Sequence, residues 1–196
     1  MLPGSTHMQQ QNTCCVDTIE NELEARHCGF LLQIGRGKNA YRGDFTVGVF
    51  GDIVPMTAYN FLLLSRGYHH RDMGDVLFQD GRSGRAIYAP YFIDENFVHQ
   101  HKAAGYVAMA NSGQDTNGSQ FYVTLARTRW LDGRNVIFGK IVEGMPTLKR
   151  LTEIRVNEHG YPAERVTIVD IKIEVLEQPY KLTDEQLLSG KAIRDD

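Results

Sequence analysis

Short runs of apolar and β-branched residues, separated by Gly, Asn and Asp, make up most of the chain between residues 30 and 178. Runs of this length bounded by turn formers predict β-strands, and six are expected, at 30–34, 45–50, 105–110, 120–124, 136–142 and 166–176. The last run alternates between apolar and charged residues, which predicts a strand buried on one face. Its apolar face is expected to hold Val169, Ile171, Ile173 and Val175. Many short strands joined by turns predict a sandwich or a barrel.

Three segments carry helical signals instead. Pro55 favours the first turn of a helix and Gly67 favours its left-handed end, so a helix is expected between them. A second helix is expected over about residues 145–154, where leucine and isoleucine recur three residues apart. Thr183 followed by Gln186 resembles a capping box and predicts a short helix in the C-terminal tail.

The composition, 42% hydrophobic and 23% charged over 196 residues, is that of an ordinary globular protein with one domain. Residues 1–8 are small, polar and patternless, and they resemble a cloning scar. Residues 9–29 then form a polar N-terminal extension, residues 30–178 the folded domain and residues 179–196 a polar C-terminal tail.

Charge and cysteine content exclude several classes of partner. A net charge of −3 and a pI near 6.2 provide no broad positive surface, so nucleic acid is not an expected partner. No apolar run approaches the roughly 20 residues of a membrane span. The three cysteines are an odd number and cannot form a closed set of disulfides within one chain. A reducing compartment, the cytoplasm, is therefore expected. The protein is also expected to be a monomer without a membrane span.

Two pairs of histidines are the candidates for metal binding. His69 and His70 are adjacent, and His99 and His101 are two residues apart, but no acid or thiolate stands at ligand spacing. Solvated loop histidines are expected instead. The glycine-basic loops match neither the phosphate-binding nor the dinucleotide-binding pattern, and no Gly-x-Ser-x-Gly elbow is present. No metal, no cofactor and no hydrolase chemistry is expected.

The segment from Gly105 to Gly144 contains the most specific motifs in the chain. The motifs that carry a resemblance are VPMTAYNF at 54–61, IY at 87–88, DENF at 94–97, MAN at 109–111, TNGSQF at 116–121, WLDG at 130–133 and VIFGK at 136–140. In their order and spacing they resemble the cyclophilins, the peptidyl-prolyl cis-trans isomerases, over about residues 30–178. This resemblance implies a mainly β fold, a closed antiparallel β-barrel with two main helices, and a groove that binds proline-containing peptides or proteins.

Rotation about an X-Pro bond meets a barrier of about 18–20 kcal/mol, because amide resonance is lost as the bond twists. A catalyst of this step needs no nucleophile. It needs an apolar pocket for the proline ring, a donor that strengthens at the prolyl nitrogen in the twisted state, and polar anchors for the flanking backbone.

The resemblance assigns most of these roles to residues 110–135. The implied anchors are Asn111, through its backbone, and Gln120. The implied substrate-binding positions on this side are Ala110, Tyr122, Trp130, Leu131 and Asn135. Tyr122 stands where the family usually has Phe, and Asn135 stands where it usually has His at the pocket rim.

The opposite wall of the pocket is expected after the first helix, where the chain departs from the family pattern. Alignment without a gap makes Arg71 the electrophilic donor, Gln79 an anchor, and Val76 and Leu77 the pocket residues. In a competing register, residues 79–80 replace the family's His-Arg and most of two strands are deleted. The first register is preferred, because losing two strands would open the barrel and expose its edges.

Two functions remain open at this point. Val76 supplies less apolar surface than the family's Phe, a loss on the order of 1–2 kcal/mol, or about tenfold in affinity. The motif from Gln120 to Leu131 supports a peptidyl-prolyl isomerase, with activity that the pocket changes reduce. Those same changes support the alternative, a module that binds X-Pro segments without appreciable turnover. A cyclosporin-type ligand is expected to bind at Trp130 with reduced affinity.

Overall fold

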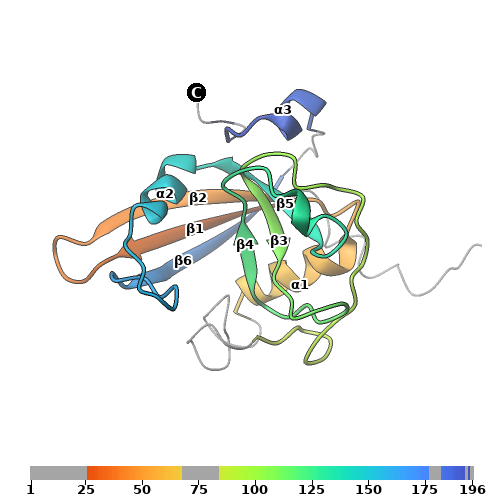
Figure 1. Ribbon diagram of the computed structural model, residues 1–196, viewed down its shortest axis with the longest axis horizontal. Helices are drawn as coiled ribbons and strands as arrows, with labels where there is room; N and C mark the ends of the chain where they lie inside the picture. The colour runs from red at the N-terminus through yellow and green to blue at the C-terminus, as the bar shows by residue number, and fades with distance from the viewer. Residues whose placement is uncertain (1–25, 68–83, 177–181, 193, 195–196) are drawn as a thin grey trace, which may run out of the picture.

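One antiparallel sheet of six strands organises the protein (Figure 1). The computed structural model describes residues 26–67, 84–176, 182–192 and 194. The strands are β1 (Arg26–Ile34), β2 (Tyr41–Val49), β3 (Tyr106–Met109), β4 (Phe121–Val123), β5 (Ile137–Glu143) and β6 (Val166–Val175). They lie in the order β4-β3-β5-β2-β1-β6. Each stretch expected to form a strand overlaps one of them, which confirms a mainly β fold.

The sheet curls into a half-barrel, with β4 and β6 at the two ends of the strand order. Closure into a complete barrel stays a prediction. The described helices are α1 (Pro55–Ser65), α2 (Met145–Thr152) and α3 (Asp184–Leu188). None of these helices is long and apolar enough to span a lipid bilayer.

β1 pairs with both β2 and β6, so it lies inside the sheet. Its register with β6 shifts next to Leu31, where Val169 is an extra residue on β6. A bulge of this kind turns the extra side chain away from its expected face. Val169 is 46% exposed, and Ile168 packs against the core in its place. The prediction that put Val169 on the apolar face is therefore wrong.

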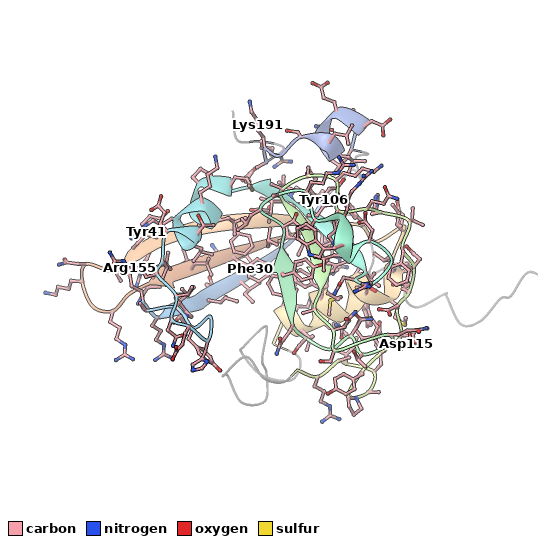
Figure 2. All side chains as sticks on the ribbon, viewed as in Figure 1. Phe30, Tyr41, Tyr106, Asp115, Arg155 and Lys191 are labelled. Carbon is pink, nitrogen blue, oxygen red and sulfur yellow. The ribbon has the colours of Figure 1, made fainter. Side chains whose placement is uncertain are left out.

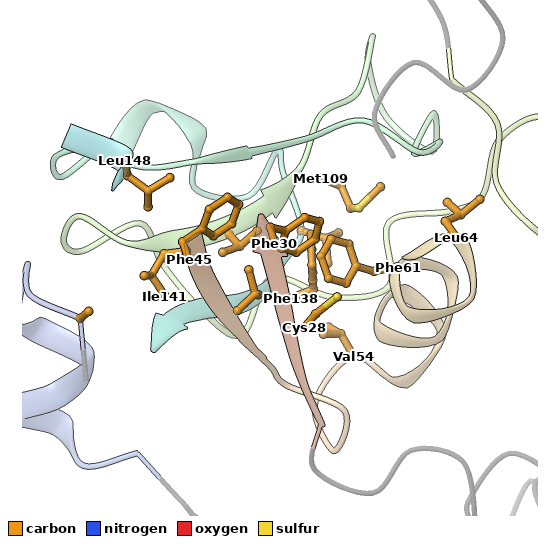
Figure 3. Close-up of a cluster of buried hydrophobic side chains, with 14 of the residues drawn as sticks. Cys28, Phe30, Phe45, Val54, Phe61, Leu64, Met109, Phe138, Ile141 and Leu148 are labelled. Carbon is orange, nitrogen blue, oxygen red and sulfur yellow. The ribbon is translucent and has the colours of Figure 1, made fainter. Parts of the chain in front are cut away.

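Aromatic rings form the centre of the core between the sheet and α1 (Figure 3). Phe30 stacks on Phe45, with ring centroids 4.9 Å apart and planes 8° from parallel. Phe61 of α1 lies 4.6 Å from Phe138 and 5.4 Å from Phe121, again between ring centroids. Such pairs stabilise the fold by about 0.5–1.5 kcal/mol each beyond the burial of their area.

Two polar side chains fix the position of α1. The Glu95 carboxylate accepts hydrogen bonds from the backbone N–H and the hydroxyl of Thr57, both at 2.8 Å. It thereby pairs with an otherwise unsatisfied N-terminal amide and places negative charge at the positive end of the helix dipole. The buried side-chain amide of Asn60 donates to the Gly118 carbonyl and accepts from the Ile87 N–H, both at 3.0 Å. Asn60 thus ties α1 to the TNGSQF segment.

β3 is buried on both of its faces. One face joins the main core, and the other contributes to a second apolar cluster, which consists of Ala103, Tyr106, Ala108 and Ile137. Tyr122 and Leu187 both pack against this second cluster, the latter from α3. The Tyr106 hydroxyl also donates to the Leu187 carbonyl at 2.9 Å. The capping box expected at Thr183 is present, and the helix that it begins docks on the outer face of the sheet (Figure 1).

Candidate functional site

The candidate site lies on the outer face of β4, beside the end of β3. Phe121 points to the core, where its ring centroid is 5.9 Å from that of Phe30. Side chains alternate along a strand, so Gln120 and Tyr122 point to the opposite face. The Ala110 N–H donates to the Gln120 carbonyl at 3.0 Å, which holds Gln120 next to the last residues of β3.

Two side-chain amides connect the end of β3 to the turn that precedes β5. Asn111 donates through Nδ2 to the Arg134 carbonyl at 2.8 Å, and Asn135 donates through Nδ2 to the Met109 carbonyl at 2.9 Å. The Asn111 side chain therefore holds this turn. That its backbone anchors a ligand stays a prediction. The side-chain amide of Asn135 likewise holds this turn to the end of β3.

The 3₁₀ turn η2 (Arg129–Leu131) presents an exposed aromatic side chain beside these residues. Trp130 is 69% exposed, although tryptophan is highly buried in most proteins. Leu131 is half-buried next to it. An indole in this position combines a large apolar surface with an N–H donor, which suits contact with a ligand.

A buried histidine links η2 to β4. His101 is 1% exposed, and its backbone N–H and Nδ1 lie 2.7 Å and 2.9 Å from Oδ1 of Asp132. Its Nε2 lies 2.8 Å from the hydroxyl of Tyr122. Partial burial acts to raise the pKa of Asp132, but the hydrogen bonds from His101 outweigh it and hold that pKa below its ordinary value. Burial, assisted by the Asp132 charge, raises the pKa of Tyr122, so its hydroxyl stays protonated at neutral pH.

A glycine allows the chain to approach Ser119, the residue before Gln120, closely. A Cβ added at Gly84 would lie 2.7 Å from Oγ and 3.1 Å from the backbone nitrogen of Ser119. The next residue, Arg85, donates its N–H to the same Oγ at 3.2 Å. Residue 84 follows directly on the connection expected to carry the opposite pocket wall, so the glycine brings the end of that connection to the site.

Comparison with known proteins supports the same assignment. The family model "Cyclophilin type peptidyl-prolyl cis-trans isomerase/CLD" matches residues 31–173. Peptidyl-prolyl cis-trans isomerase-like 1 of Aspergillus fumigatus is 39% identical over 146 residues, which are 67% of this chain and 89% of that protein. Peptidyl-prolyl cis-trans isomerase CYP21-1 of Arabidopsis thaliana is 35% identical over 151 residues, 65% of this chain and 67% of that protein. The chain belongs to the cyclophilin family.

The structure brings together those expected site residues of this cyclophilin that it describes. They are Ala110, Asn111, Gln120, Tyr122, Trp130, Leu131 and Asn135. Four further expected residues, Arg71, Val76, Leu77 and Gln79, lie outside the described residues. In the described part of the chain, no group of three or more His, Cys, Asp or Glu residues is placed to hold a metal ion.

One buried residue beside the candidate site, His101, was not expected there. It was expected to be a solvated loop histidine, and that prediction is wrong, because the loop folds over the outer face of β3 and buries the ring. A signal was present in the sequence. Tyr122 stands where the family usually has Phe, and its added hydroxyl needs a hydrogen-bond partner when it is partly buried.

Proposed function

We propose that this cyclophilin catalyses cis-trans isomerisation of X-Pro bonds on the face formed by β4, the end of β3 and η2. One observation carries the proposal: Gln120 and Tyr122 project from the same face of β4, beside the turn that exposes Trp130. A polar anchor, an aromatic wall and an exposed indole on one surface are the features that binding a prolyl segment requires.

In this mechanism the protein acts by differential binding and forms no covalent bond. Tyr122 and Leu131 contact the proline ring, while Gln120 and the backbone of Asn111 bind the flanking peptide, with Ala110 and Asn135 at the edges. Holding the proline ring and the flanking backbone lowers the barrier where these contacts are stronger with the twisted amide than with the planar one.

The electrophilic part of the mechanism rests on the family resemblance. We assign Arg71 as the donor to the prolyl nitrogen, Gln79 as a further anchor, and Val76 and Leu77 as the opposite wall. Donation to the nitrogen strengthens as its lone pair localises, so this interaction lowers the barrier and not just the ground state. Replacing Arg71 with Ala should lower kcat/KM on the order of 100-fold with the fold intact. Arg36→Ala, at the distant β1–β2 turn, is the matched control, and an unchanged rate in Arg71→Ala would remove Arg71 from the mechanism.

The decisive assay is NMR exchange on an X-Pro peptide, because it detects turnover whatever the register of residues 68–83. The wild-type protein should accelerate exchange, and Gln120→Ala should lower kcat/KM by about 3- to 10-fold, the range for losing one or two hydrogen bonds. Lys149→Ala, on the exposed side of α2, should match the wild type. Binding without acceleration by the wild-type protein would favour the X-Pro binding module instead.

The changed pocket should also alter recognition of cyclosporin-type ligands. Trp130 is expected to donate its indole N–H to such a ligand, with affinity reduced by Val76, Tyr122 and Asn135. Calorimetry should therefore show tighter binding by Asn135→His than by the wild type. We further propose that the barrel closes and that the protein acts as a monomer in the cytoplasm.

A further inference from the structure

We propose that His101 is the positioning residue of the prolyl pocket, fixing the Tyr122 ring through Nε2 and the Trp130 turn through its backbone and Nδ1. The inference rests on the proposed function, because it takes Tyr122 and Trp130 to be pocket residues. It adds to that function a residue that contacts no substrate.

The backbone of His101 brackets η2. Its carbonyl accepts from the N–H of Thr128, immediately before the turn, at 3.1 Å. Its N–H donates to the carboxylate of Asp132, immediately after the turn, at 2.7 Å. The residue that exposes the indole, Trp130, lies between these two attachments. One buried residue thereby sets both ends of the turn.

The partners of the His101 ring decide where its hydrogen lies. An ionised Asp132 carboxylate can accept but not donate, so Nδ1, at 2.9 Å, carries the hydrogen. In the neutral ring Nε2 is then an acceptor, and the Tyr122 hydroxyl donates to it across 2.8 Å. The two ring planes differ by 12°, so the Tyr122 and His101 rings lie nearly parallel.

As a consequence, the Tyr122 ring, one wall of the proposed pocket, is held by a hydrogen bond at its hydroxyl end. A Phe at position 122 would be held by packing alone, whereas Tyr122 is tied by its hydroxyl to a ring that is itself tied to Asp132. An orientation fixed in the free protein helps the ground state and the twisted state alike, so its loss should appear in KM more than in kcat.

Two substitutions at His101 separate the two ring contacts, since both preserve its backbone bonds. His101→Asn reaches about as far as Nδ1 and keeps the bond to Asp132, whereas His101→Gln reaches about as far as Nε2 and can still accept from Tyr122. We expect His101→Asn to raise KM by about 2- to 10-fold with kcat little changed, and His101→Gln to raise it less. In a Tyr122→Phe background His101→Gln should no longer have the lower KM of the two, because the hydroxyl that it would accept from is absent and only the side chain of His101→Asn still bonds to Asp132.

Equal KM for folded His101→Asn, His101→Gln and wild type would overturn the inference, as would a KM for His101→Gln that stays below that of His101→Asn in the Tyr122→Phe background. If the variants do not fold, ¹⁵N NMR of the wild-type imidazole decides: the hydrogen should be on Nδ1, and a hydrogen on Nε2 would overturn the inference. If the wild type shows no turnover, the proposed function fails separately. The Kd of the X-Pro peptide, measured by NMR titration, then replaces KM in the same comparison.

Discussion

Two buried ionisable side chains flank the outer face of β3, and their surroundings differ. His101, beside the candidate site, has side-chain partners at both ring nitrogens. Lys140 of β5, beside the C-terminal segment, is also fully buried. Its ammonium group donates to the carbonyls of Ala104 at 3.3 Å and Ser189 at 3.1 Å and lies 4.5 Å from the centre of the Tyr106 ring.

The difference appears in the ionisation of the two regions. Near the site, hydrogen bonds from His101 stabilise the charged form of Asp132. Around Lys140, carbonyl dipoles and a ring face only partly replace lost hydration, and burial lowers its pKa to about 8. A neutral amine still has two N–H donors for the two carbonyls and avoids the cost of burying a charge, so the docking of α3 should depend on pH. The ring of His101, in contrast, is held by side-chain partners at both nitrogens.

The largest expected effect comes from removing the Asp132 carboxylate, which accepts two hydrogen bonds from His101. Asp132→Ala removes the acceptor for the buried N–H and Nδ1–H of His101, and each unsatisfied donor costs about 1–3 kcal/mol. We expect the free energy of unfolding to fall by about 2–4 kcal/mol in urea denaturation. Asp132→Asn, which keeps an acceptor oxygen at nearly the same size, should lose less. Equal losses for the two variants would show that charge, and not hydrogen bonding, matters here.

The elements with strong local patterns were predictable from the sequence. All six strands, α1, α2 and the Thr183 cap follow from periodicity, proline and capping signals within each segment. The expected site residues were chosen from ordered motifs, since a motif fixes which strand carries each side chain. These signals are local, so they can be interpreted without knowledge of the tertiary contacts.

The features that were missed depend on distant segments. Val169 turns outward because the β6 register shifts against β1, which the alternation in β6 does not encode. His101 and Lys140 look like solvent-exposed residues in the sequence. The first is buried by its loop, and the second is covered by a segment more than 40 residues later. Burial of a polar residue by a remote segment leaves little trace in its neighbours.

Removing residues 182–196 tests whether Tyr122 depends on Leu187, since both residues pack against the second apolar cluster. The truncation exposes Tyr106 and Lys140 and removes the packing of Leu187, so we expect a loss of about 1–3 kcal/mol of stability in urea. Peptide isomerisation should stay within about twofold, since the loss is in apolar packing away from the groove. Lost activity with retained folding would show that the cluster transmits a change from Leu187 to Tyr122.

Replacing Lys140 with Met tests whether docking depends on pH. The folded-state pKa of Lys140, about 8, lies below its ordinary value of 10.5, so the unfolded state binds more protons between these values. Stability contributed by this group therefore rises with pH above about 8, by at most about 1.4 kcal/mol per pH unit. The Cys28 thiol, with its pKa raised to about 12 by burial, acts in the opposite direction above pH 9. Between pH 7.5 and 9, Lys140→Met should lose the upward slope in urea denaturation, and Lys149→Met should keep it.

The smallest effect is expected at the exposed end of the C-terminal segment. Arg194 donates through Nη1 to Glu143 at 3.1 Å, and both side chains are partly exposed. An exposed pair of this kind contributes about 0–1 kcal/mol, so Arg194→Ala should barely change the free energy of unfolding. A local readout is sharper: burial and then the Arg194 charge lower the pKa of His27, so the substitution should raise that pKa in an NMR titration. If Arg194→Ala instead destabilised the protein as much as truncation does, the ion pair, and not Lys140 with the Leu187 contact, would hold the segment on the sheet.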